Sequence, residues 1–531
     1  MTGSWVRRYG DSLSHVPDAT AYFVADDADT VGLASALDAL AQRFSVEQSV
    51  ARSLLRTWLD TDDWLLHKAG MVLEQRESTT DGLRLILRRA EGREHTQPVE
   101  VITWPARIDA LPPGPVRAQI EGVVGIRALL PVASLRALRR DVRVMNEDRK
   151  TVVRMAIESS PKSGATQLPD HLTVSAVRGY QAQADRVTAR LATVTGIFAV
   201  ATSPYEQALQ ANGRVFGDDV PTPVEMSASM PARNAVTAVI HSFLSTVERT
   251  LGGVISDIDT EFLHDFRVAI RRSRSTLKLS GDVLASGPAE QLSLDLKWLG
   301  DLTSPTRDLD VYILGLPDMA DGLQSAAPAD LDPFRDYLLS RRRTEFRLLV
   351  RALRSARFRR ALDHWRALGL ETEPSNPGKL TSAGELAADR LSRAHRRVTK
   401  RGSAIGADSA PEELHDLRKR CKELRYLLEI FRPLHDPATH RAVLRDLKAL
   451  QEVLGEFQDS EVQGLAVREF ALTMLSTGSA PARTVLAMGE LAAQLSAHQR
   501  HARTAFAGSF AVFNSADSKR RFRELTRGSS G

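Results

Sequence analysis

A repeat in the second half of the chain constrains its fold more than any other feature. The segment Leu263-His264-Asp265-Phe266-Arg267 recurs 151 residues later as Leu414-His415-Asp416-Leu417-Arg418. The same spacing, without a gap, relates Asp295-Leu296-Lys297 to Asp446-Leu447-Lys448. A coincidence of composition between two helices rich in arginine and leucine would not extend this far. The repeat therefore predicts two copies of one structural unit, related by a pseudo-twofold axis.

Helices are expected throughout the repeated region, because the sequence from residue 232 to residue 526 reads as one helix after another. We expect two homologous helical bundles, with repeat 1 at about residues 232–370 and repeat 2 at about residues 379–526. Glycine and proline predict breaks between helices near Gly252-Gly253, Gly287-Pro288, Pro317, Pro328–Pro333, Pro374–Gly378, Gly402–Pro411, Pro433–Pro437 and Gly478–Pro481.

Residues 1–204 have a different character, in which short β-like runs alternate with helical stretches. Turn signals predict two hairpins, Val72–Glu74 with Leu83–Leu87 and Val142–Val144 with Val152–Ile157. Further strands are expected at Val99–Trp104 and His171–Val177, and helices at Ala34–Phe44 and Ala182–Leu191. This mixture predicts an α+β domain built on an antiparallel barrel or sheet. Residues 205–231, with three prolines and little periodicity, predict a linker.

Each copy of the repeat predicts a helix with one basic face and one apolar face. At 100° per residue, a stripe about 80° wide on the first helix holds His264, Arg267, Arg271, Arg274 and Lys278. A separate apolar stripe holds Phe266, Ile270 and Leu277. On the second helix the basic stripe holds His415, Arg418, Lys422 and Arg425, and the apolar stripe holds Leu417, Cys421, Leu424 and Leu428. The apolar stripes explain packing, whereas the basic stripes need another explanation.

Two explanations of the basic stripes are open. A charged stripe is most often a solvated surface, and acids such as Asp265 or Asp308 on neighbouring helices would then pair with it. Solvated faces, however, usually alternate Glu with Lys at a spacing of four residues. The stripe residues named above include no acid, and each pair of neighbouring like charges costs on the order of 0.2–0.5 kcal/mol. The same cost at equivalent positions of both copies favours an anionic ligand that offsets it.

A third basic element lies between these two helices, where residues 341–360 contain nine arginines and one glutamate. Arg343, Arg347, Arg351 and Arg354 fall on one helical face. Arginine donates paired hydrogen bonds that match phosphate oxygens. Aromatic residues make up only 6% of the chain and few lie among the arginines, so stacking platforms for bases are scarce. Phosphate without bases is the simpler ligand.

The two repeat histidines, His264 and His415, allow two interpretations. A histidine in a basic stripe would have its cation disfavoured unless an anion is bound, and it would then donate to phosphate. The alternative is a neutral histidine that is hydrogen-bonded at a helix interface.

The composition of the chain limits the cellular compartment in which we expect the protein. The single cysteine, Cys421, excludes an intramolecular disulfide, which suits a reducing environment. No apolar run approaches the roughly 20 residues that cross a bilayer, and the first residues lack the apolar block of a secretory signal. We therefore expect a cytoplasmic protein that does not enter a membrane. The net charge is +5, and residues 231–531 carry 45 basic against 38 acidic residues, so the basic bias lies in the repeated region.

The repeated region resembles the CHAD domain, the conserved histidine α-helical domain, over about residues 232–526. The resemblance is carried by LHDFRVAIRRSRSTLKL with LKWLGDLTSPTRDLDV, and by LHDLRKRCKELRYLLEIF with LKALQEVLGEFQD. It implies two four-helix bundles around a basic groove or pore that binds inorganic polyphosphate, and binding rather than catalysis. It also implies that the two basic stripes face this groove from opposite sides, with Lys297 and Lys448 on the next helix of each copy.

Residues 1–204 resemble a divergent CYTH domain, the triphosphate tunnel fold. The matching segments are Thr57–Leu66 with Ala69–Leu73, and Ser203–Leu209. Active members open with a strand reading E-x-E-x-K, whose glutamates hold a divalent metal. Here that strand reads Thr20-Ala21-Tyr22-Phe23-Val24, and a later one reads Thr173-Val174-Ser175-Ala176. Without those carboxylates, metal-dependent hydrolysis should fail.

The arginines that remain in residues 1–204 allow anion binding or an ordinary surface role; they are Arg76, Arg84, Arg88, Arg139, Arg143 and Arg154. The working hypothesis is a degenerate tunnel-like domain followed by a CHAD domain that binds polyphosphate and, as the resemblance implies, is recruited to polyphosphate granules. No catalytic residue, cofactor or resident metal is expected. The alternatives are a metal-dependent triphosphatase or polyphosphatase of the CYTH type, a nucleic-acid-binding protein and a purely structural module.

Overall fold

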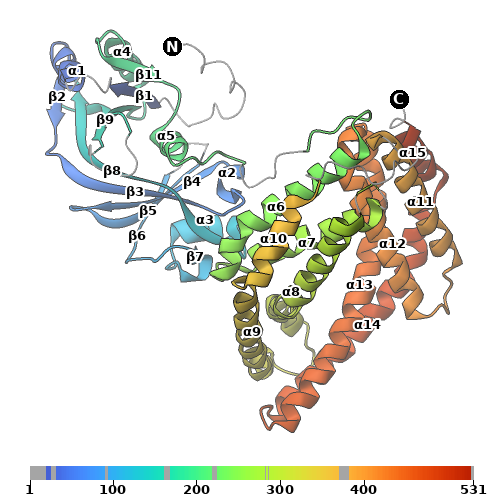
Figure 1. Ribbon diagram of the computed structural model, residues 1–531. Coiled ribbons are helices and arrows are strands. Elements are labelled where there is room, and N and C mark those ends of the chain that lie inside the picture. Colours follow the sequence, from blue (N-terminus) through green and yellow to red (C-terminus); the bar gives the residue numbers. More distant parts are fainter. Residues whose placement is uncertain are drawn as a thin grey trace. The chain divides into compact units, whose positions relative to one another are not determined.

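The computed structural model describes residues 20–25, 31–89, 94–160, 168–217, 224–280, 283–284, 286–369 and 382–527. The chain divides into two compact units, Met1–Val220 and Pro221–Gly531. The first unit is an antiparallel sheet with helices, and the second is helical (Figure 1), as the sequence predicts. No helix in these described ranges is long and apolar enough to cross a bilayer.

The sheet of the first unit is antiparallel at every pairing, and its main path runs β11-β1-β10-β9-β8-β3-β4-β5-β6. The strands are β1 Thr20–Ala25, β2 Ser45–Gln48, β3 Arg52–Asp60, β4 Met71–Ser78, β5 Gly82–Arg89, β6 Glu94–Pro98, β7 Ala106–Arg107, β8 Ala128–Met145, β9 Thr151–Ser159, β10 His171–Ala176 and β11 Ile197–Val200. The helices are α1 Val31–Ala41, α2 Leu65–Lys68, α3 Pro115–Val124, α4 Gln181–Leu191 and α5 Pro204–Ala211.

Both predicted hairpins are confirmed as β4–β5 and β8–β9, and the predicted strand at His171–Val177 is β10. The strand expected at Val99–Trp104 is wrong, because the edge strand is β6, just before it. Val99, Ile102 and Trp104 are apolar because they anchor a loop on the core between β4, β5 and α3. The Trp104 indole donates to Gln75 Oε1 at 2.7 Å, which fixes that loop.

Helix α5 lies inside the stretch that we expected to be a linker. Ser203 and Glu206 form a capping box at its start, and Pro204 occupies its first turn. Tyr205, Ala208 and Leu209 are buried in a core that also contains Trp58 and Trp64. The start of the stretch therefore packs within the first unit.

The second unit contains two sets of five helices among its described residues. Repeat 1 has α6 Ala232–Ile255, α7 Thr260–Ser280, α8 Ser286–Asp321, α9 Asp332–Leu353 and α10 Ala356–Ala367. Repeat 2 has α11 Ala383–Ala404, α12 Pro411–Ile430, α13 Pro437–Ser476, α14 Ala482–Phe513 and α15 Ala516–Arg527. The first three helices of repeat 2 each begin 151 residues after their counterparts. Only two residues separate α9 from α10, and α14 from α15, so the fourth helix of each copy is broken near its end.

The break expected at Pro317 is wrong, because α8 continues through both Pro305 and Pro317. Each proline removes one hydrogen bond of the helix. Both side chains are exposed, so the lost bond falls on the solvent side of the helix, where its cost is smallest. The opposite side of α8 stays packed, because Leu309, Tyr312 and Leu316 share one core with Val467 and Leu491 of repeat 2.

Two adjacent glycines of α6 provide a test of how α6 packs against α7. A Cβ on Gly253 would lie 2.2 Å from Cδ1 of Phe262, whereas a Cβ on Gly252 meets no atom within 4 Å. We expect Gly253→Ala to lower the free energy of unfolding by about 1–3 kcal/mol, as overpacked cores do. Gly252→Ala is the matched control and should be neutral or stabilising by up to about 1 kcal/mol. Urea unfolding of both variants checks this, and equal effects would contradict the packing of α6 on α7.

Candidate functional site

Helices α7 and α12 have the two-faced character that the sequence predicts. Phe266, Ile270 and Leu277 are buried on α7, and Leu417 and Leu424 are buried on α12. The start of α7 is fixed by Asp259, whose Oδ1 accepts from the backbone N–H groups of Glu261 and Phe262 at 2.9 and 3.2 Å. With the apolar faces buried, the basic faces are left at the surface of the unit.

The two repeats meet where α7 packs against α12. Lys278 Nζ lies 3.1 Å from Glu423 Oε1, and Arg272 Nη2 lies 2.8 Å from Glu429 Oε2. Partly exposed ion pairs of this kind contribute roughly 0–1 kcal/mol each. Their main effect is on geometry, because they hold the basic face of one repeat beside that of the other.

Lys422 is affected by positive charges from both basic faces. Burial lowers its pKa, the positive charges of Arg418, Arg271 and Arg425 lower it further, and Asp459 opposes them, so that the pKa falls to about 8. Arg418 and Arg425 lie on the same helix as Lys422, but Arg271 belongs to the other repeat. A stripe that merely faced water would leave this lysine at its ordinary value of about 10.4.

A cavity of about 390 Å³ lies beside these residues, between α12 and α13. Four cations line it, namely Arg418, Lys422, Arg425 and Lys448. Three carboxylates of α13 line it as well, namely Glu452, Glu456 and Asp459. The structure therefore places Lys448 with the basic stripe of its own repeat, as predicted, and adds acids that the stripe alone did not reveal.

The stripe is less purely basic than the sequence analysis stated. Glu429, at the position equivalent to Lys278, continues the stripe of α12 and pairs with Arg425 at 3.3 Å. Arg418 pairs with Asp459 at 2.9 Å. Arg267 points its Nη1 at α8, where Thr303 Oγ1 and Ser304 Oγ accept at 2.8 and 3.0 Å. These arginines are thus partly occupied by the protein itself.

Two cations of the α7 stripe have no partner among the described residues. Arg271 and Arg274 are exposed, and neither forms a hydrogen bond or ion pair with another described residue. Their guanidinium groups keep all five donors for a ligand.

The two repeat histidines have different partners. His415 Nδ1 is hydrogen-bonded to the side-chain oxygen of Gln458. At the equivalent place in repeat 1, His264 faces Arg307, and burial together with that charge lowers the pKa of His264. The hydrogen bond of His415 fits the interpretation of a histidine at a helix interface, whereas burial and the charge of Arg307 disfavour the cationic form of His264.

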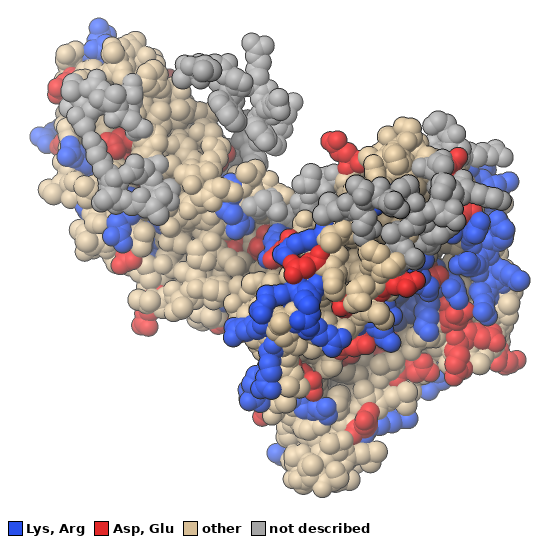
Figure 2. Space-filling model, viewed as in Figure 1, with Lys and Arg blue, Asp and Glu red and all other residues tan. Residues whose placement is uncertain are grey.

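The remaining predicted residues lie elsewhere on the second unit. Arg343, Arg347 and Arg351 are exposed on α9, and Arg354 is exposed directly after its end; none of these four lines the α12–α13 cavity. Lys297 is exposed on α8 and lines a different cavity, with residues of α10. Figure 2 shows the basic side chains gathered over α9 and α10.

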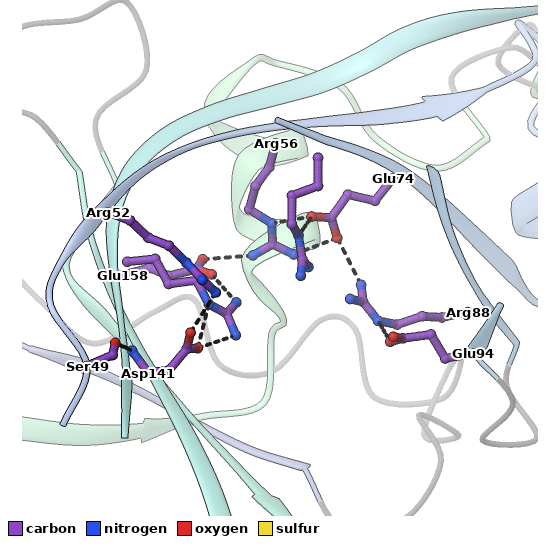
Figure 3. Close-up of polar contacts among 10 residues, drawn as sticks. Ser49, Arg52, Arg56, Glu74, Arg88, Glu94, Asp141 and Glu158 are labelled. Atoms are coloured by element: carbon purple, nitrogen blue, oxygen red, sulfur yellow. Dashed lines mark hydrogen bonds and ion pairs between the residues drawn. The ribbon is translucent and has the colours of Figure 1, made fainter. Parts of the chain in front are cut away.

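The interior of the first unit holds an ionic network that the sequence analysis missed (Figure 3). Glu74 on β4 is fully buried and accepts from Arg56, Arg76 and Arg88, each at 2.9 Å. Burial raises the pKa of this carboxyl, but Arg56, Arg88 and Arg76 outweigh burial and hold the pKa well below its usual range. Glu158 on β9 is paired with Arg56 at 2.8 Å and with Arg139 at 2.9 Å.

The network provides the partners of several arginines of the first unit. Arg76, Arg88 and Arg139, which we considered for anion binding, already have buried carboxylates as partners. Arg84 donates to the Asp81 carbonyl, and Arg143 pairs with Glu47. The carboxylates are equally occupied, and the described residues contain no group of three or more His, Cys, Asp or Glu that could hold a metal ion. In the sequence, the only sign of this network was that charged residues occupy inward-facing positions of neighbouring strands.

Comparison with known proteins finds a family match within the helical unit. Residues 238–468 match the family model of the CHAD domain. The chain is 30% identical over 212 residues to Uncharacterized protein Rv2226 of Mycobacterium tuberculosis, and the match spans 38% of each protein. The chain thus spans little more than a third of the length of this curated relative.

Two solved structures resemble the two units. The CHAD domain from the plant Ricinus communis has a TM-score of 0.46 and 26% identity, over 55% of this chain and 95% of that chain. HpAC1 from Hippeastrum, described as having a dominant triphosphatase activity, has a TM-score of 0.26 and 12% identity, over 37% of this chain and 97% of that chain.

The buried network yields a stability test. Glu74→Gln leaves three guanidinium groups without their shared carboxylate, and we expect a loss of about 3–5 kcal/mol in the free energy of unfolding of the first unit. Glu77→Gln, an exposed glutamate on the same strand, is the matched control and should change stability by less than about 0.5 kcal/mol. Denaturant unfolding followed by near-UV circular dichroism measures both, and a neutral Glu74→Gln would contradict the network.

Proposed function

We propose that this chain, in which residues 238–468 form a CHAD domain, binds inorganic polyphosphate through one surface built by both repeats. This surface, the α7–α12 basic surface, consists of Arg271, Arg274, Lys278, Arg418, Lys422, Arg425 and Lys448. The observation that carries the proposal is the position of Lys422 beside arginines of both repeats; its burial, together with the charges of these arginines, lowers its pKa to about 8. The resemblance of the LHD repeats to CHAD domains supports the same ligand.

Crowded cations raise the free energy of the empty protein, and a bound anion removes that cost. At an effective dielectric constant of 20, two charges 4 Å apart interact by about 4 kcal/mol. The protein relieves part of the repulsion with Asp459 and Glu429, but Arg271 and Arg274 have no such partner among the described residues. The surface therefore favours a ligand that brings negative charge to both helices.

The carboxylates of the α12–α13 cavity restrict the kind of anion. Glu452, Glu456 and Asp459 repel a single phosphate that enters beside Lys448. A chain of phosphates gains from every cation it touches and can follow the cations past these acids, so a polyanion suits the surface better than a small anion. The described residues that line this cavity include no aromatic side chain, which disfavours single-stranded nucleic acid.

A metal-dependent triphosphatase in the first unit remains the enzymatic alternative, and no observation favours it. Its interior cations and carboxylates neutralise each other. Recruitment of the chain to polyphosphate granules is the cellular consequence that we propose.

Charge reversal on the two facing helices tests the proposal. We expect Arg271→Glu combined with Lys422→Glu to weaken polyphosphate binding at least tenfold and to flatten its salt dependence, since fewer counterions are released. Arg396→Glu combined with Arg397→Glu on α11 changes the net charge equally at exposed positions and is the matched control. Titration by fluorescence anisotropy at two salt concentrations gives both quantities. Equal losses in the two double variants would reject the α7–α12 basic surface as the site.

The lowered pKa of Lys422 gives a pH signature. A bound polyanion favours the charged lysine, so binding near pH 8 takes up a proton and affinity falls as the pH rises above about 8. Lys422→Arg keeps its charge over this range, so it should bind as tightly as the wild type at pH 7 and lose the pH dependence. Calorimetric titrations between pH 7 and pH 9.5 test this, and superimposable pH profiles would contradict it.

A further inference from the structure

A second cavity lies in repeat 1, between α8 and α10, with a volume of about 560 Å³. The carboxylate of Asp301 lines it, and the other charged or aromatic side chains of the lining are Asp295, Lys297, Trp298, Arg357, Arg360 and His364. The volume is within the range of about 300–1,000 Å³ that small-molecule sites occupy. Of these residues, only Lys297 was expected to contact a ligand.

A cation–π contact forms one wall of this cavity. The guanidinium carbon of Arg357 lies 4.2 Å from the centre of the Trp298 ring, so the indole holds the guanidinium in place. An arginine held this way presents its outer face for stacking and its edge as a set of donors. Base planes stack on both aromatic rings and guanidinium groups.

Free positive charge lies beside this contact. Lys297 and Arg360 are exposed, and neither forms a hydrogen bond or ion pair with another residue in the described part of the chain. Their donors are available to phosphate oxygens. The cavity therefore combines a flat stacking surface with phosphate-binding groups.

The duplication provides an internal comparison for this site. His364 Nδ1 lies 2.7 Å from Asp295 Oδ2, whereas the equivalent carboxylate in repeat 2, Asp446, is bound by Arg521. An arginine in repeat 2 thus takes the place that the histidine has in repeat 1 as the partner of this carboxylate. The position equivalent to Trp298 in repeat 2 is Ala449, so the cation–π contact is also confined to repeat 1. The two repeats have diverged around one shared framework.

The two cavities also differ in whether apolar side chains line them. The cavity between α12 and α13 is lined by charged residues, one glutamine and one glycine. The cavity between α8 and α10 adds Trp298 and Leu294, whose side chains are apolar. An anion that carries a ring gains from the second cavity and not from the first.

We propose that the α8–α10 cavity binds a nucleoside polyphosphate, with its base against the Arg357–Trp298 contact and its phosphates on Lys297 and Arg360. This site uses none of the residues of the α7–α12 basic surface, so it does not depend on polyphosphate binding there. The asymmetry makes repeat 1 responsive to an organic phosphate while the joined repeats hold an inorganic one.

Three probes separate the contributions of ring and charge: ATP, tripolyphosphate, which has similar charge and no ring, and adenosine, which has the ring alone. In the full chain carrying Arg271→Glu and Lys422→Glu, which removes phosphate binding at the α7–α12 basic surface, we expect ATP to bind at least tenfold more tightly than either of the others at matched salt and pH, measured by isothermal titration calorimetry. Weaker or equal binding of ATP relative to tripolyphosphate would overturn the proposal.

Variants then assign the site. Trp298→Ala should remove the advantage of ATP over tripolyphosphate, and Arg357→Lys, which keeps the charge and the packing, should reduce that advantage by a factor of about 5 or more, as loss of a stacking partner does. Arg360→Ala should weaken both phosphates. Arg396→Ala on α11, an exposed position outside both cavities, is the control and should leave ATP binding unchanged. ATP binding that survives in both Trp298→Ala and Arg357→Lys, or that fails in Arg396→Ala, would contradict the assignment.

Discussion

In the second unit, helices α7 and α12 pack against each other and hold many positive charges close together. Helices α7 and α12 bury Phe266, Ile270 and Leu424, and that burial fixes where their basic faces must lie. The cross-repeat pairs of Lys278 with Glu423 and of Arg272 with Glu429 then set the two faces side by side. Burying one fully apolar side chain contributes about 1.5–3 kcal/mol, which exceeds the repulsion of a neighbouring pair of cations on one helix. Packing therefore maintains a concentration of positive charge that electrostatics alone would disperse.

Gene-internal duplication explains how this surface is built and why its halves differ. The 151-residue spacing keeps α6–α8 and α11–α13 in register, so equivalent side chains occupy equivalent places. Within that framework, Arg307 beside the histidine of repeat 1 corresponds to Gln458 in repeat 2, and Trp298 corresponds to Ala449. The buried carboxylates Asp295 and Asp446 stay while their partners change. The conserved part of each repeat supports the fold, and the altered part changes what each cavity can bind.

The sequence was sufficient for the periodic features of this molecule. Helical spacing placed the basic stripes, and turn signals placed both hairpins, because those signals are local. It was insufficient wherever the answer depended on a partner distant in the sequence. The acid that pairs with Arg418, the carboxylate of Glu74 among three arginines, and the loop at Val99–Trp104 all depend on tertiary contacts. The break expected at Pro317 was wrong for the same reason. The opposite face of α8 packs against other helices, so the helix continues past this proline.

The most direct test is the pKa of Lys422 itself, read by NMR from the side-chain carbon next to its amino group in protein with labelled lysine, and assigned with Lys422→Arg. The account predicts a pKa near 8 in the free protein and a clear rise when long-chain polyphosphate is added. An ordinary lysine value near 10.4 in the free protein would show that the arginines of the two repeats do not converge there. A lowered value that polyphosphate leaves unchanged would show that the anion does not bind where they converge.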